Sequence, residues 1–135
     1  MTMFRQLLVP LDGSRLAETV LPAVVALAAR EKSRVTLLHV VEAAAPKSIH
    51  GERHLAAGSD ADAYLEEVHG WLRVRGVEAD VRVEQGAGDV ATAICHAAGA
   101  TGTDLIALCT HGGRGVRGLL FGRVAQQVLA RGHIP

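Results

Sequence analysis

Residues 109–124 read Cys-Thr-His-Gly-Gly-Arg-Gly-Val-Arg-Gly-Leu-Leu-Phe-Gly-Arg-Val, and this stretch decides the fold. It follows the apolar run 105–108, which predicts a buried strand, and it precedes a pattern typical of a helix. Its five glycines allow the backbone to approach a ligand closely, and the helix behind them directs N–H groups and a positive dipole end toward that ligand. Because three arginines lie among the glycines, we expect an anion here, above all a phosphate.

The length and composition of the chain predict a single domain, residues 1–135, with its own core. Hydrophobic residues make up 49% of the chain and aromatic residues only 3%, so the core is expected to consist mainly of Ala, Val and Leu. That composition suits helices packed on a parallel sheet. No stretch has transmembrane length and the first residues do not resemble a signal peptide, so we expect a cytoplasmic protein without a membrane partner.

The charges balance overall but are distributed unevenly along the chain. The formal net charge is zero, which argues against a general nucleic-acid-binding protein. All 14 acidic residues lie at or before Asp104, whereas residues 105–135 carry four arginines and no acid. This excess has two interpretations, a chance cluster on a solvated helix face or a contribution to anion binding by the glycine-rich segment.

Apolar periodicity predicts four strands that alternate with four helices. The strands are expected at 7–11, 34–41, 77–85 and 104–108, and the helices at 16–32, at 59–75, from the turn at 86–89 to about 100, and at 119–131. Such an alternation is typical of the α/β class, an open, doubly wound parallel sheet with helices on both faces.

Local signals refine these elements. The alternation of apolar and polar residues over 77–85 predicts an edge strand. Pro22 predicts either a kink in the first helix or its true first turn, and Gly76 predicts the end of the second helix. Residues 42–60 lack periodicity and are expected to form a long loop. In the last helix the apolar face is expected to comprise Leu120, Val124, Val128 and Leu129.

Three common nucleotide or nucleophile motifs do not account for the glycine-rich segment. Gly113-x-Gly115-x-x-Gly118 matches the dinucleotide fingerprint in form, but it lies in the last strand–helix unit and no acidic residue follows to bind a ribose. The sequence contains neither a Walker-type phosphate loop nor a Gly-x-Ser-x-Gly nucleophile elbow.

Four motifs together resemble the universal stress protein family, an adenine-nucleotide-binding α/β fold, over essentially the whole chain. They are Leu-Leu-Val-Pro-Leu-Asp-Gly-Ser at 7–14, Leu-Leu-His-Val-Val at 37–41, Gly-Asp-Val-Ala at 88–91, and Thr-His-Gly followed by Leu-Leu-Phe-Gly-x-Val-Ala within 110–129. The resemblance implies five parallel strands in the order 3-2-1-4-5, of which the fifth would follow Pro135 and is missing from this chain. It also implies a homodimer, commonly formed through that fifth strand.

The resemblance further implies one half of a nucleotide site at the ends of the first two strands. Asp12, with Pro10 and Leu11 beside it, would hold the adenine and ribose together with Val40 of the second strand. A carboxylate accepts hydrogen bonds from an amino group or a hydroxyl, and valine supplies an apolar wall. Read without the family, Asp12 is equally suited to cap the next helix, and Val40 to fill the core.

The other half of the implied site is the phosphate segment. In nucleotide-binding members it reads Gly-x-x-Gly, nine residues, then Gly followed by Ser or Thr, and the matching positions here are Cys109, Gly112, Gly122 and Arg123. Cys109 and Arg123 therefore depart from the pattern. Arg123 either grips a phosphate from further away or folds across the loop and blocks it. The remaining candidates are His111, Gly113, Arg114 and Val124, with loop orientation and a solvated surface as the alternatives for His111 and Arg114.

The resemblance, together with these residues, implies a stress sensor that binds ATP or a related adenine nucleotide, with Mg²⁺ only if ATP is bound. No residue is placed as a catalytic base or nucleophile and no metal-ligand pattern occurs, so any hydrolysis would be slow and secondary to binding. One alternative keeps the fold but not the nucleotide, with function in dimerisation or partner binding. A third, weaker one is an enzyme such as a nucleotidyl transferase.

Overall fold

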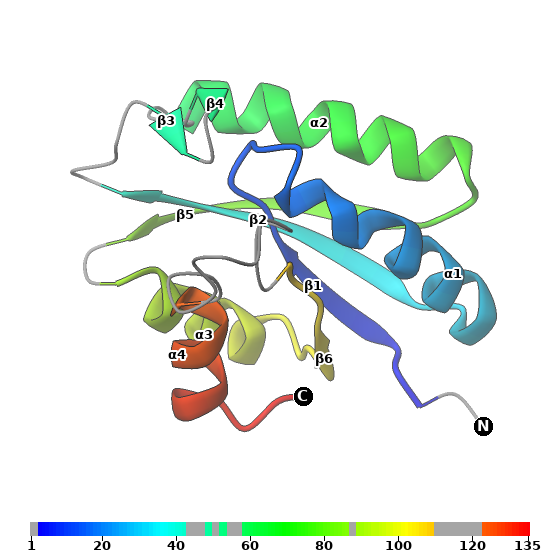
Figure 1. Cartoon of the computed structure of the whole chain (residues 1–135). Coiled ribbons are helices and arrows are strands. Elements are labelled where there is room, and N and C mark those ends of the chain that lie inside the picture. The colour runs from blue at the N-terminus through cyan, green and yellow to red at the C-terminus, as the bar shows by residue number, and fades with distance from the viewer. Residues whose placement is uncertain (1–2, 43–47, 50–51, 54–57, 87–88, 110–122) are drawn as a thin grey trace, which may run out of the picture.

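The computed structural model describes residues 3–42, 48–49, 52–53, 58–86, 89–109 and 123–135. Its main sheet has four parallel strands, β1 (Gln6–Pro10), β2 (Arg34–Glu42), β5 (Ala79–Gly86) and β6 (Leu105–Ile106), in the order β5-β2-β1-β6 (Figure 1). In chain order this is 3-2-1-4, which confirms the predicted open α/β sheet and its expected strand order over these four strands.

Helices cover both faces of the sheet. Between the strands lie η1 (Ala17–Val20), α1 (Leu21–Glu31), α2 (Gly58–Val74) and α3 (Val90–Ala100), and α4 (Arg123–Arg131) follows β6. Figure 1 shows α1 and α2 on one face and α3 and α4 on the other. The two core clusters follow this division: Leu7, Val9, Val35 and Leu37 face α1 and α2, and Leu8, Leu38 and Val40 face α3 and α4. The alternation along each strand thus sends successive side chains into different cores, as a doubly covered sheet requires.

The signals for helix ends were correct where the structure describes them. Pro22 lies in the first turn of α1 and produces no interior kink, because the missing N–H of proline is not needed there. Gly76 follows α2 with φ of +79°, a left-handed conformation that glycine adopts without a steric cost. Asp89 caps α3, and its side chain accepts a hydrogen bond from the backbone N–H of Thr92 at 2.7 Å.

Three expectations need correction. The fourth strand was expected at 104–108 but is limited to Leu105–Ile106, because only these two residues pair with β1. The stretch 42–60 is not simply a loop, since β3 (Ser48–Ile49) and β4 (Glu52–Arg53) form a short antiparallel pair within it. Leu129 is 74% exposed, because Ala125 and Val128 take the buried side of α4. The expected first turn of that helix, 119–122, lies outside the described residues.

The end of the chain lies against the outer side of β6. The backbone N–H of Ile106 donates to the carbonyl oxygen of Pro135 at 2.7 Å, on the side of the strand opposite β1. Pro135 therefore lies beside β6 on the side away from β1.

Candidate functional site

The strand order creates a topological switch point between β1 and β6. The chain passes from β1 to β2 and then β5 on one side, and returns to place β6 on the other side of β1. Ligands of open α/β sheets bind outside the carboxyl ends of strands at such a point, because the connections there diverge to opposite faces. Asp12 and Cys109 follow the ends of these two strands, so these two residues lie at the same edge of the sheet.

The turn after β1 fixes the Asp12 carboxylate through the sequence Asp-Gly-Ser. Asp12 Oδ1 accepts hydrogen bonds from the Ser14 backbone N–H at 2.8 Å and from the Ser14 hydroxyl at 2.5 Å. Gly13 has φ of +90°, which lets the chain reverse between them. Ser14 is fully buried, and its hydroxyl oxygen accepts from the Ala17 N–H at 3.1 Å at the start of η1. The bond to the first residue of η1 therefore comes from Ser14 and not from Asp12, and the two hydrogen bonds that Ser14 donates orient the Asp12 carboxylate.

His39 is a contributor to this turn that the sequence reasoning missed. Its Nδ1 lies 2.8 Å from the carbonyl oxygen of Leu11, and the side chain is 2% exposed. A carbonyl oxygen only accepts, so Nδ1 carries the proton and donates. The bond ties the residue before Asp12 to β2. A histidine within the otherwise apolar run Leu37–Val41 was the available signal, because a buried imidazole requires a hydrogen-bond partner.

The backbone of Val40 is directed toward the edge of the sheet where Asp12 lies, and its side chain is directed into the core. Its side chain is 6% exposed and belongs to the cluster under α3. The Leu11 N–H donates to the Leu38 carbonyl at 2.8 Å, so Leu38 directs its peptide groups toward β1. Two residues on, Val40 directs its own peptide groups to the same side, beyond the end of β1 at Pro10. They are therefore directed toward the edge where Asp12 lies.

Gly86 allows this arrangement at the end of β5. A Cβ at position 86 would lie 2.9 Å from Val40 Cγ1 and 3.3 Å from the Val41 carbonyl oxygen. Contacts below 3.0 Å essentially do not occur for real Cβ atoms, so only glycine fits here without a displacement of Val40. Gly86 thus determines how closely β5 approaches the end of β2.

Cys109 and the segment after Asp12 are in direct contact. The Thr19 hydroxyl in η1 lies 3.5 Å from Cys109 Sγ, a weak hydrogen bond between residues 90 positions apart. Cys109 is half-buried and its thiol is free of any disulfide. The cysteine that replaces the family glycine therefore packs toward η1, at the boundary between the two halves of the candidate site.

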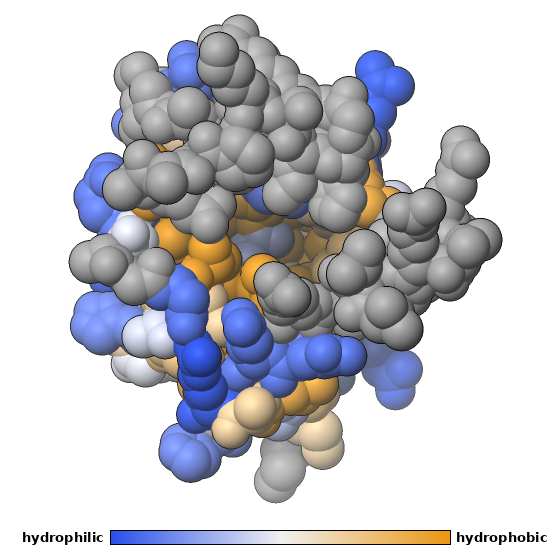
Figure 2. Space-filling model, turned by 60° about the vertical axis from the view of Figure 1, so that its left-hand side comes forward, coloured by the Kyte–Doolittle hydropathy of each residue, from blue (hydrophilic) through white to orange (hydrophobic). Residues whose placement is uncertain are grey.

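The predicted phosphate segment is described only in part. His111, Gly112, Gly113, Arg114 and Gly122 lie outside the described residues. Arg123 is the first residue of α4, and Val124 is half-buried against the cluster that contains Val40. Figure 2, turned toward the side on which β2 and β5 end, shows a hollow in this face with hydrophobic surface inside it.

An ion pair holds α4 in place behind this edge. The Arg131 guanidinium, at the end of α4, binds the Asp89 carboxylate, and it also donates to the Thr92 hydroxyl at 2.9 Å. The hydrogen bond from Arg131, followed by that from the Thr92 N–H, lowers the pKa of Asp89 to about 2. This ion pair joins the start of α3 to the end of α4.

The described part of the chain offers no protein-made metal site. Within it, no group of three or more His, Cys, Asp and Glu side chains could hold a metal ion. Within the same residues, no helix has both the length and the apolar character to cross a membrane.

Comparison with known proteins identifies related folds. The family model described as the universal stress protein family matches residues 3–135. A universal stress protein family member from Burkholderia pseudomallei is similar at 27% identity and a TM-score of 0.66, with 100% of this chain and 95% of that chain covered. No protein of curated function matches the sequence.

Two further solved structures carry nucleotides. One is a universal stress protein in complex with cAMP, 18% identical with a TM-score of 0.70, where 98% of this chain and 93% of that chain are covered. The other is the universal stress protein from Archaeoglobus fulgidus in complex with dAMP, 19% identical with a TM-score of 0.68, where 100% and 96% are covered. At these sequence identities the structural similarity shows that this chain shares the fold of these proteins.

Proposed function

This chain belongs to the universal stress protein family, and on that premise we propose that it binds ATP or a related adenine nucleotide at the carboxyl ends of β1 and β6. The observation that carries the proposal is the meeting of two chain segments at the switch point, where Thr19, which follows the Asp12 turn, contacts Cys109. Two proteins of the same fold were solved with cAMP and dAMP, which supports an adenine nucleotide as the ligand.

Each part of the site has a role set by its chemistry. The Asp12 carboxylate, oriented by Ser14, accepts hydrogen bonds from the ribose hydroxyls or the adenine amino group. The Val40 peptide, with Pro10 and Leu11 beside it, contacts the base. The segment from Cys109 to Val124, with His111, Gly112, Gly113, Arg114, Gly122 and Arg123, surrounds the phosphates, and Mg²⁺ accompanies the nucleotide only if it is ATP. The protein binds rather than transforms its ligand, and acts as a stress sensor.

Isothermal titration calorimetry with ATP, ADP, AMP and cAMP tests the proposal directly. Asp12→Asn should weaken binding by about tenfold or more, because a hydrogen bond to a charged acceptor contributes ~1.5–3 kcal/mol. Asp62→Asn, an exposed carboxylate on α2, is the matched control and should bind as the wild type does. The absence of binding by any of the four nucleotides at millimolar concentration would refute the proposal.

A second candidate function follows from Arg123, which begins α4 where nucleotide-binding members have Ser or Thr. If the arginine blocks the phosphate position, the protein acts through dimerisation or partner binding instead. Arg123→Ser separates the two functions, since binding that appears only in this variant identifies the arginine as a block. For either function we propose that the protein is a homodimer in the cytoplasm. Analytical ultracentrifugation with and without ATP tests whether it forms the dimer.

A further inference from the structure

His39 lies beside Val40 near the end of β2 and is almost completely buried. Its exposed fraction is 2%, and its Nδ1 donates to the carbonyl oxygen of Leu11 at 2.8 Å. The other positions of the motif at 37–41 are leucine or valine. Because burial of a polar imidazole costs free energy that burial of an aliphatic side chain does not, this hydrogen bond indicates a role beyond packing.

The backbone ladder between β1 and β2 ends at this point. Its register runs to the pair Pro10 and Leu38, and the Leu11 N–H still donates to the Leu38 carbonyl at 2.8 Å. In a regular parallel ladder the next bond would run from the Val40 N–H to the Leu11 carbonyl oxygen. Leu11 and Val40 are both described, and no hydrogen bond joins these two groups.

The imidazole takes the place of this backbone bond. Leu37 packs in the core cluster under α1 and α2, and His39, two residues on, is directed to the same face of the sheet. Leu11 belongs to that cluster too, so its carbonyl oxygen accepts the imidazole N–H from the face of the sheet and not from the adjacent strand. The Val40 N–H therefore stays directed at the edge where Asp12 lies, with the Leu11 carbonyl held by another donor.

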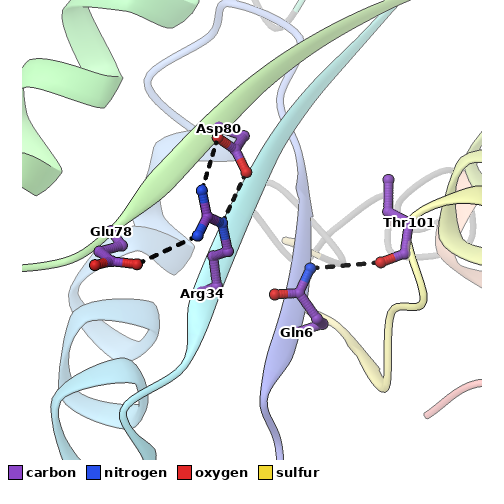
Figure 3. A network of polar contacts seen from close by, with 5 residues as sticks. All are labelled: Gln6, Arg34, Glu78, Asp80 and Thr101. Carbon is purple, nitrogen blue, oxygen red and sulfur yellow. Dashed lines mark hydrogen bonds and ion pairs between the residues drawn. The ribbon is translucent and has the colours of Figure 1, made fainter.

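Side chains at the amino ends of the same strands leave the ladder intact. Figure 3 shows Arg34 directed toward Asp80, to which its Nε donates at 2.9 Å, and Gln6 directed toward Thr101, whose carbonyl accepts at 3.4 Å. At that end the backbone N–H of Arg34 donates to the Arg5 carbonyl at 2.8 Å, so the ladder continues beyond the first residue of β1. The bond from the imidazole is different, because it occupies a carbonyl that the ladder would use.

The Val40 peptide matches one edge of adenine when its N–H is available. An extended residue directs its N–H and its carbonyl to the same side of the strand. Adenine has a ring nitrogen that accepts next to an amino group that donates, so the ring nitrogen can pair with the N–H and the amino group with the carbonyl. A bond from the Val40 N–H to Leu11 would remove the donor from this pair.

We propose that His39 is a positioning residue of the nucleotide site, which holds the Leu11 carbonyl and thereby keeps the Val40 N–H available for the base. The inference rests on the proposed function, and the imidazole acts through Leu11 and Val40 without touching the ligand. When the imidazole is removed, the Leu11 carbonyl accepts from the Val40 N–H and the ladder extends by one bond. The loss is therefore expected in recognition of the base.

Calorimetry with ATP and inosine triphosphate tests this role, since the latter carries an oxygen in place of the amino group. The wild type should prefer ATP. His39→Leu should bind ATP about tenfold more weakly and lose most of that preference. His39→Asn should restore both, because its amide nitrogen takes the position of Nδ1. Thr36→Val, a change at a residue of β2 that is 4% exposed and far from Leu11 in the register, is the control and should keep the wild-type affinity.

Amide hydrogen exchange provides a readout that needs no nucleotide. In the ¹⁵N-labelled wild type, followed by two-dimensional NMR, the Val40 amide should exchange about tenfold faster than the Leu38 amide, which lies within the ladder. In His39→Leu the two rates should become similar, because the Val40 N–H then donates to the Leu11 carbonyl. Addition of ATP to the wild type should slow the exchange at Val40.

The possible failures are distinguishable. Equal protection of the Val40 and Leu38 amides in the nucleotide-free wild type overturns the inference, and this measurement decides even if His39→Leu does not fold. Unchanged ATP affinity and base preference in folded His39→Leu overturn it as well, while the proposed function stands. So does an equal loss in His39→Asn or Thr36→Val, because the lost interaction would then not be the bond to Leu11. If the wild type binds no nucleotide, the proposed function fails and this inference fails with it.

Discussion

Gly86→Ala is the substitution whose effect the structure defines most sharply. The added Cβ would lie 2.9 Å from Val40 Cγ1, and Val40 is 6% exposed and has a β-branched side chain with little rotamer freedom. Overpacking of this kind costs about 1–3 kcal/mol, whereas replacement of glycine by alanine gains about 0.4–1 kcal/mol from the unfolded chain. We expect a net loss of about 1–2 kcal/mol in the free energy of unfolding.

The assay is urea denaturation followed by circular dichroism, together with a double-mutant cycle. Val40→Ala removes the methyl groups that the new Cβ meets, so the pair Gly86→Ala and Val40→Ala should show a favourable coupling of about 1 kcal/mol. Gly99→Ala is the matched control, because a Cβ at this exposed position of α3 meets no atom within 4 Å. That control should stabilise the protein by about 0.5–1 kcal/mol.

Nucleotide affinity gives the same substitution a second readout. Because the added Cβ should displace the end of β2, Gly86→Ala should bind ATP more weakly than the wild type under conditions where the variant is fully folded. Gly99→Ala should bind ATP as the wild type does. The reasoning is refuted if Gly86→Ala is as stable as Gly99→Ala, or if the cycle shows no coupling, since either result means that β5 does not approach Val40 as closely as the structure has it.

Three further predictions concern stability. The pKa of Asp89 is lowered from 3.8 to about 2 in the folded protein, so its contribution to stability is complete above pH 3.8 and is lost as the pH falls through about 2. The urea midpoint of Asp89→Asn should therefore fall less steeply with decreasing pH over that range than the midpoint of the wild type. The same dependence of the midpoint on pH in both proteins would contradict the ion pair with Arg131. Lys32 ends α1 with φ of 56°, a left-handed conformation that is strained for a residue with a side chain. Lys32→Gly should therefore raise the free energy of unfolding by about 0.5–1 kcal/mol in chemical denaturation, and a less stable variant would disprove this strain. Ile94→Ala truncates a side chain that is 1% exposed between α3 and the sheet, and should lower the free energy of unfolding by about 2–5 kcal/mol in the same assay. A loss below about 1 kcal/mol would be incompatible with a close-packed core.

Local sequence patterns predicted most of the elements because they depend on neighbours in the chain. The alternation over 77–85 indicated an edge strand, and β5 is at the edge of the sheet. Pro22 and Gly76 marked a helix start and a helix end through their own backbone restrictions. The errors occurred where tertiary contacts decide. Leu129 is apolar but lies on the exposed side of α4, and β6 is shorter than its apolar run because only Leu105 and Ile106 pair with β1.

In the candidate site, too, the local contacts could be predicted from the sequence and the long-range contacts could not. The Asp-Gly-Ser turn was evident from the sequence, because its hydrogen bonds join residues two and three positions apart. The role of His39 was not, since its partner Leu11 lies 28 positions away. The positions of His111, Gly112, Gly113, Arg114 and Gly122 remain predictions from the sequence and the family.

By itself the sequence determined the α/β class, the family and the residues from which a nucleotide site is expected. Only the tertiary structure decided that Gly86 limits the space around Val40, that Thr19 meets Cys109, and that Thr36 of β2 pairs with Asp80 of β5. The physical reason is that periodicity and turn chemistry are encoded within a few residues. Register and lateral contact between strands depend instead on the packing of the whole chain, in which partners are many positions apart.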